Sequence, residues 1–171
     1  MKYVVFSDTH GDISAAKDVL DNLQGEIDGV IHLGDLDDDA LNLEKRFKNL
    51  IFYYVKGNNE FGSLCPEERV ISAGGYNIFL THGHKYRVYF GPLRLLYAAK
   101  EKQAHAVLFG HTHSPFCCVE GGVLLFNPGS ISHPRSGIYG TFGLLEIKDG
   151  KFPRGEIYEY MGKGIFKPKI F

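Results

Sequence analysis

The first 60 residues alternate short apolar runs with amphipathic segments. Residues 3–6, 29–33 and 51–55 are mostly apolar, and each run has the length of a buried strand. Between them, apolar residues recur every three or four positions, as in helices that bury one face; they are Ile13, Ala16, Leu20 and Leu23, then Ala40, Leu43 and Phe47. This order of strands and helices predicts right-handed crossovers and a parallel sheet.

The second half of the chain has more strand signals. Gly74-Gly75 separates two apolar runs and predicts a hairpin, and a helix is predicted from Pro92 to about Gln103. Five further strands are predicted at residues 106–109, 116–119, 123–126, 142–147 and 157–160. Residues 162–171 show no clear period and are expected to form a packed or loose tail. The pattern favours an α/β fold in which two sheets pack face to face with helices outside.

Length and composition place the chain among globular proteins. The 171 residues, without a visible repeat or linker, predict a single domain over residues 1–171 with its own core. The net charge of −1 gives no support for nucleic-acid or membrane-surface binding. Only four apolar residues follow Lys2, which is too few for a signal peptide, so the cytoplasm is the expected compartment. Cys65, Cys117 and Cys118 are expected to be reduced packing residues.

Five polar segments each follow a predicted strand directly. They are Asp8-Thr9-His10, Gly34-Asp35, Gly57-Asn58-Asn59-Glu60, Thr81-His82-Gly83-His84 and Gly110-His111-Thr112-His113. Ligands bind at the carboxyl ends of strands in open α/β sheets, so these segments should gather at one edge. The neighbouring glycines allow tight turns and close backbone approach.

The donor types in these segments suit divalent metals. Carboxylate, amide oxygen and imidazole favour manganese, iron, zinc or nickel. Asp-x-His and His-x-His would place alternate side chains of an extended segment on one side, so that two ligands reach one ion or two adjacent ions. Asp35, at the centre of the set, is the natural bridge between two cations. A binuclear metal centre is a standard solution for phosphate ester cleavage.

The five segments, in this order, resemble the signature of the calcineurin-like metallophosphoesterase superfamily. Ser7-Asp8-Thr9-His10-Gly11, Thr81-His82-Gly83-His84 and Asn127-Pro128-Gly129-Ser130 look most similar to its small bacterial and archaeal phosphodiesterases, over roughly residues 1–147. The resemblance implies a four-layer αββα sandwich of two mixed sheets flanked by helices. It also implies that Asp8, His10 and His113 hold one metal, that Asn58, His82 and His111 hold the second, and that Asp35 bridges them.

The function expected from this resemblance is two-metal-dependent hydrolysis of a small phosphoester, foremost a phosphodiester. Manganese is the first expectation, with nickel, iron or zinc as other choices, and a hydroxide between the metals would attack phosphorus directly. Asn59 and His84 are the candidate catalytic residues. Asn59 replaces a His that protonates the leaving group in many phosphatases of the superfamily, and Asn cannot serve as a general acid. The resemblance also suggests a homo-oligomer, a dimer or a higher assembly.

Several residues also have a structural interpretation. Asp37, Asp38 and Asp39 are expected to form a solvated helix start, and His32 a core residue with satisfied hydrogen bonds. His105 and His133 are expected to be incidental, and Lys85, Arg87 and Arg135 are more often surface residues than substrate contacts. Asn127 and Pro128 are expected to form a turn that shapes the site.

Two other functions remain open. The retromer subunit of eukaryotic endosomal sorting resembles the same fold and acts as a protein-binding scaffold with a degraded metal site. All seven ligand positions here hold competent residues, which disfavours that alternative. A nuclease would share the chemistry, but the balanced charge gives it no support.

Overall fold

The computed structural model describes residues 1–60 and 62–170. In its first half, β1 (Lys2–Phe6), β2 (Gly29–His32) and β3 (Ile51–Tyr54) pair in parallel, with Tyr3 opposite Gly29 and Gly29 opposite Ile51. The crossovers are α1 (Ser14–Leu23) and α2 (Asp37–Arg46). The predicted parallel unit is therefore confirmed.

Three antiparallel strands from the end of the chain complete this first sheet. They are β9 (Gly140–Lys148), β10 (Lys151–Gly162) and β11 (Ile165–Pro168), and the order is β11-β10-β9-β1-β2-β3. The expected tail thus contains an edge strand, whose Phe166 packs on Phe142 with ring centroids 5.4 Å apart. A four-residue strand is too short to show a period in the sequence.

The second sheet mixes parallel and antiparallel pairs. Its strand order is β4-β5-β6-β8-β7, from β4 (Glu68–Ala73), β5 (Tyr76–Thr81), β6 (Ala106–Leu108), β8 (Val123–Asn127) and β7 (Phe116–Glu120). Between β5 and β6 lie two 3-10 turns, η1 (His84–Tyr86) and η2 (Val88–Phe90), and α3 (Leu93–Glu101). The predicted hairpin and helix are both present, with Pro92 at the N-cap of α3.

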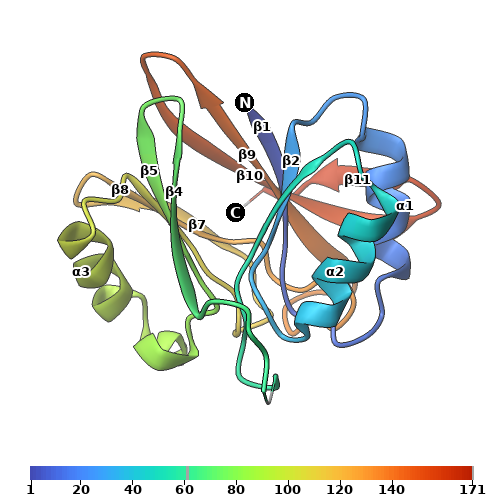
Figure 1. Ribbon diagram of the computed structural model, residues 1–171, viewed down its shortest axis with the longest axis horizontal. Helices are drawn as coiled ribbons and strands as arrows, with labels where there is room; N and C mark the ends of the chain where they lie inside the picture. Colours follow the sequence, from blue (N-terminus) through green and yellow to red (C-terminus); the bar gives the residue numbers. More distant parts are fainter. Residues whose placement is uncertain (61, 171) are drawn as a thin grey trace.

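The two sheets pack face to face with helices on the outside (Figure 1). Along β1, Tyr3 and Val5 enter the core between the sheets, whereas Val4 and Phe6 pack under α1. On the other side, Phe79 packs with Leu95 of α3. The four-layer αββα prediction is confirmed. Across the described residues, no helix has the length and apolarity needed to span a membrane, and the three cysteines are free.

Phe126 of β8 fills the space between the two sheets where two glycines face it. Its side chain is fully buried and faces two glycines of the opposite sheet, Gly143 on β9 and Gly155 on β10. A Cβ built at either glycine would lie 2.5 Å from atoms of the Phe126 ring. Glycine at both positions therefore makes room for the aromatic ring between the sheets.

We expect Gly143→Ala or Gly155→Ala to lower the free energy of unfolding by about 1–3 kcal/mol, because the added methyl overpacks the core. Denaturant unfolding of each variant measures the loss. Gly25→Ala is the matched control, since a Cβ there meets nothing within 4 Å. Equal stability of the three variants would contradict this account of the sheet contact.

Candidate metal centre

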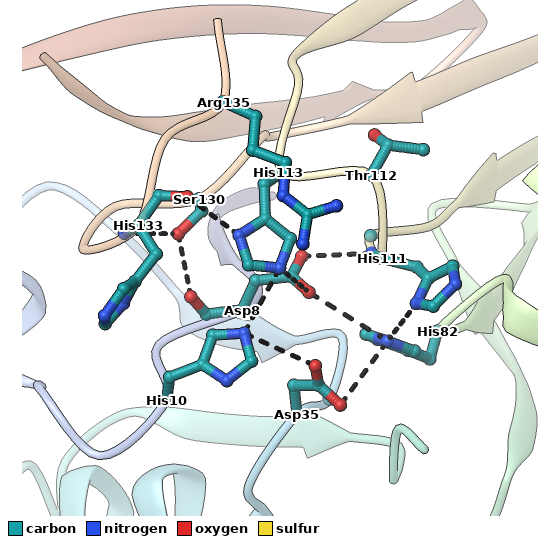
Figure 2. A network of polar contacts seen from close by, with 12 residues as sticks. Asp8, His10, Asp35, His82, His111, Thr112, His113, Ser130, His133 and Arg135 are labelled. Atoms are coloured by element: carbon teal, nitrogen blue, oxygen red, sulfur yellow. Dashed lines mark hydrogen bonds and ion pairs between the residues drawn. The ribbon is translucent and has the colours of Figure 1, made fainter. Parts of the chain in front are cut away.

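Loops that follow the strands of both sheets meet at one site. Asp8 follows β1, Asp35 follows β2, His82 follows β5, and His111 and His113 follow β6. Figure 2 shows their side chains pointing toward one another from separate loops. The convergence predicted from strand-end placement is therefore present in the fold.

Four of these side chains form a first compact group. Asp8, His10, Asp35 and His113 each offer one ligand atom, and these atoms lie within 4.8 Å of one another. The two imidazole nitrogens, Nε2 of His10 and Nε2 of His113, are 3.2 Å apart. His113 Nε2 lies 3.4 Å from Asp8 Oδ1, and His10 Nε2 lies 3.4 Å from Asp35 Oδ2.

A second pair of imidazoles lies on the other side of Asp35. His82 Nε2 is 3.2 Å from His111 Nδ1 and 3.5 Å from Asp35 Oδ1. The two oxygens of Asp35 therefore face different groups, with Oδ2 toward His10 and Oδ1 toward His82. This places Asp35 between the two sets of donors.

Asn58 and Asn59 occupy the exposed rim beside Asp35. The Asn58 backbone N–H donates to Asp35 Oδ1 at 3.2 Å, and its side-chain amide donates to Asn59 Oδ1 at 3.3 Å. The Asn59 amide donates to Asp35 Oδ2 at 3.0 Å. Both asparagines thus lie next to the central carboxylate, and Asn59 orients it.

Backbone carbonyls fix the tautomers of two of the histidines. His113 Nδ1 lies 2.7 Å from the carbonyl of His133, and His82 Nδ1 lies 2.8 Å from the carbonyl of Leu33. A carbonyl only accepts, so each Nδ1 carries the proton. The lone pair of each Nε2 is left facing the centre of the site, which is the arrangement of metal-ligating histidines.

The electrostatics of the group favour a bound cation. Asp8 is fully buried, and its Oδ1 has no hydrogen-bond partner. Burial raises the pKa of Asp8 to about 7, with the nearby Asp35 also raising it. Burial lowers the pKa of His82 to about 4, so this imidazole is neutral and can act as a ligand. Asp8 Oδ1 lies 3.9 Å from Nε2 of His82, and an unsatisfied carboxylate oxygen beside a neutral imidazole fits a divalent metal.

The ligand loops have unusual backbone conformations. Five of the converging residues have positive φ, namely Asp8 (56°), His10 (48°), Asp35 (61°), His111 (68°) and His113 (56°). Non-glycine residues rarely adopt this region, and such residues cluster at functional sites. The prediction that the Asp-x-His and His-x-His segments are extended is therefore wrong. Left-handed turns, rather than strand alternation, bring each pair of side chains together.

Two glycines allow the loops to approach each other closely. A Cβ at Gly110 would lie 1.8 Å from Ser7 Oγ and 2.8 Å from Asp8 Oδ2. A Cβ at Gly57 would lie 2.5 Å from Asp35 Oδ1. The close approach expected beside the ligand residues is confirmed at both positions.

A buried hydrogen-bond network supports two of the ligand loops. His32 Nδ1 accepts from Gly34 N–H at 3.3 Å, so its Nε2 donates to the hydroxyl of Thr9 at 3.0 Å. Thr9 in turn donates to Asp39 Oδ2 at 2.6 Å. His32 is a satisfied core residue, as expected. The predicted helix start at Asp37–Asp39 is confirmed as the first turn of α2, but Asp39 is buried rather than solvated, because it accepts from Thr9 and from Gly11 N–H.

The loop after β8 holds the Asp8 segment and the β6 loop. Ser130 Oγ donates to the carbonyl of Asp8 at 2.7 Å, and the Asn127 amide donates to the carbonyl of Gly110 at 3.0 Å. Asn127 Oδ1 also accepts from Gly129 N–H at 2.8 Å, in agreement with the expected turn. The Asn-Pro-Gly-Ser sequence was the only signal of this support.

His84 and His133 flank the two groups of donors. The His84 ring lies 5.5 Å from that of His82, and its Nδ1 is buried without a hydrogen-bond partner. Burial lowers the pKa of His84. His133, which was expected to be incidental, contributes its backbone carbonyl to His113, and its ring lies 5.2 Å from that of His10.

The basic residues divide into two sets. Lys85 pairs with Glu67 at the surface, and Arg87 lines a separate hollow with Phe90. Arg135 instead lies beside the donors, where its backbone N–H donates to the carbonyl of His113 at 3.1 Å. Tyr89 also contacts the site, because its hydroxyl donates a hydrogen bond to the carbonyl of His111 at 2.8 Å. No motif in the sequence marks this tyrosine.

Comparison with known proteins agrees with the geometry. Residues 1–150 match the model of the calcineurin-like phosphoesterase superfamily domain. The chain is 33% identical to the "Probable metallophosphoesterase YsnB" of Bacillus subtilis over 150 residues, covering 87% of this chain and 86% of that protein. It is 29% identical to the phosphodiesterase MJ0936 of Methanocaldococcus jannaschii over 170 residues, covering 89% of this chain and 96% of that protein.

The fold is also similar to that of solved structures. A single mutant of Vps29 from Entamoeba histolytica superposes with a TM-score of 0.81 at 25% identity, covering 99% of this chain and 97% of that one. The resemblance inferred from the five polar segments is therefore confirmed. The chain belongs to the calcineurin-like phosphoesterase superfamily, a family of metal-using hydrolases.

Proposed function

We propose that this protein hydrolyses phosphodiesters with two divalent cations, one on each side of Asp35. The observation that carries the proposal is the position of that carboxylate, with one oxygen 3.4 Å from His10 and the other 3.5 Å from His82. Asp8, His10 and His113 would hold the first cation. His82, His111 and the side-chain oxygen of Asn58 would hold the second, and manganese is the first candidate for both.

Two bound cations would supply an activated water at neutral pH and would neutralise charge on the phosphoryl oxygens. The chain's own residues position that chemistry. Asn59 fixes Asp35 by its amide hydrogen bond, while the carbonyls of Leu33 and His133 hold His82 and His113 in the required tautomers. These contacts remove freedom from the donors before any substrate binds.

His84 is proposed to contact the phosphoryl group. Its Nδ1 lacks a partner, and its ring lies 6.0 Å from that of His111 and near that of His82. An unpartnered polar atom beside the donors is suited to hydrogen-bond a substrate oxygen. Asn59 already uses its amide to donate to Asp35, whereas His84 Nδ1 has no partner among the described residues.

The preference for diesters rests on Asn59 and on the relatives. An amide cannot protonate a leaving alkoxide, so substrates with good leaving groups should react best. The Methanocaldococcus jannaschii relative carries the name phosphodiesterase, which supports the same choice. The likeness to Vps29, whose name refers to vacuolar protein sorting, is compatible with a scaffold role but does not favour it.

Asp35→Asn should reduce turnover of a nitrophenyl diester by at least about 100-fold, because the central carboxylate is lost from both groups of donors. The metal content per chain, measured by mass spectrometry, should fall in the same variant. Asp38→Asn is the matched control, since Asp38 lies three residues away, outside the two groups of donors. Full activity of Asp35→Asn with manganese would refute the two-metal proposal.

Activated diesters should react faster than alkyl monoesters by a factor of about 100 or more, the typical contribution of a general acid. The measurement compares kcat/KM for a bis-nitrophenyl phosphate and for a peptide containing phosphoserine, on metal-stripped protein with each metal restored. Comparable turnover of the two would show that the chain has a proton donor that Asn59 does not provide.

Metal affinity should weaken as pH falls below about 7, by about 10-fold per pH unit. Asp8, with its pKa raised to about 7, is protonated below that pH in the metal-free protein, so the cation must displace a proton. His82 is neutral throughout this range because its pKa is lowered to about 4. Calorimetric titration with manganese at several pH values measures the effect, and an affinity independent of pH would contradict it.

A further inference from the structure

An apolar pocket lies directly beside the metal centre. Its volume is about 410 Å³, and it lies between η2, the start of α3, the β6 loop and β7. Aromatic residues and prolines provide half of its lining residues, namely Tyr89, Phe109 and Phe116 with Pro92 and Pro115. Such a lining suits a planar apolar group, and the volume is at the small end of ligand sites.

The pocket and the metal centre share a wall. Thr112, which lines the pocket, stands between His111 and His113 in the chain. The Tyr89 ring lies 4.9 Å from the His111 ring, and its hydroxyl donates to the His111 carbonyl. A molecule with its phosphate at the donors therefore has its attached group within reach of the pocket.

Arg135 provides a positive charge where the two sites meet. Its guanidinium lies over the Tyr89 ring at 5.8 Å and contacts the Tyr89 hydroxyl. Figure 2 shows this guanidinium beside His113 and His111, directed toward the donors. Among residues 1–60 and 62–170, the arginines that form ion pairs are Arg46, with Asp21, and Arg154, with Glu156, so Arg135 forms none. Its charge is available for an anionic phosphoryl oxygen.

We infer that this pocket binds a planar aromatic group of the phosphoester, while Arg135 binds one of its phosphoryl oxygens. The inference rests on the proposed function, because the phosphate must lie at the metal donors. Two of the rings, Tyr89 and Phe116, are partly exposed, at 52% and 37%, and can stack on an incoming ring. The substrate class is therefore an aryl or nucleoside phosphodiester rather than an alkyl one.

The test compares phenylphosphonate with methylphosphonate, whose P–C bonds resist hydrolysis. Binding to the manganese-loaded protein is measured by calorimetry, so no turnover is required. Phenylphosphonate should bind at least about 10-fold tighter, as expected for a ring buried in an apolar pocket. Phe116→Ala should remove most of this preference and leave methylphosphonate affinity unchanged, with Phe116→Leu intermediate.

Two further variants separate the ring from the phosphate. Phe152→Ala is the matched control, because Phe152 is a similarly exposed phenylalanine, at 42%, that packs on Tyr76 away from the pocket. Arg135→Met should weaken both phosphonates about equally and leave their ratio unchanged. Retained methylphosphonate binding shows that the Phe116 and Phe152 variants are folded, and circular dichroism with thermal unfolding checks the fold of Arg135→Met.

The outcomes are distinct. Equal affinity of the two phosphonates for the wild-type protein, or an unchanged ratio in Phe116→Ala, overturns the pocket inference while leaving the metal-centred function intact. Binding of neither phosphonate overturns both. A phosphonate analogue of a nucleoside monophosphate extends the test: a loss in Phe116→Ala that includes this analogue identifies a nucleobase, whereas a loss confined to phenylphosphonate identifies a smaller aryl group.

Discussion

The structure depends on holding two carboxylates and four imidazoles together in a largely buried space. Asp8 and Asp35 repel each other there, and burial raises the pKa of Asp8 to about 7. Asp8 Oδ1 has no hydrogen-bond partner, and two carbonyls direct imidazole lone pairs inward. Divalent cations would relieve all of these penalties at once, so the rest of the fold can be understood as a frame for their ligands.

Hydrogen bonds outside the group of donor atoms hold the loops that carry these side chains. His32, Thr9 and Asp39 connect the loops after β1 and β2 to α2, and Ser130 holds the backbone of Asp8. Glycines permit close contact where a side chain would collide, as at Gly110 against Ser7. The strained positive-φ ligand residues are therefore held by many hydrogen bonds and by tight packing.

The loop after β6 borders both the candidate metal centre and the apolar pocket. His111 and His113 belong to the donors, while Thr112 between them lines the apolar pocket, and Tyr89 and Arg135 contact the carbonyls of the two histidines. Under the proposed function, an organic group in this pocket would lie beside Thr112, the residue between two of the proposed metal ligands. The proposed substrate pocket and the proposed metal ligands would then share one loop of a single small fold.

The sequence by itself determined the parallel unit, the two sheets and the five polar segments, because apolar periodicity and strand-end placement are local properties. It could not show the edge strand β11, which is four residues long, or the burial of Asp39, which depends on Thr9 from another loop. Only the tertiary structure decided the left-handed turns, the position of Asp35 between two groups and the pocket beside Tyr89. These features arise from contacts between residues far apart in the chain, and no local pattern encodes such distances.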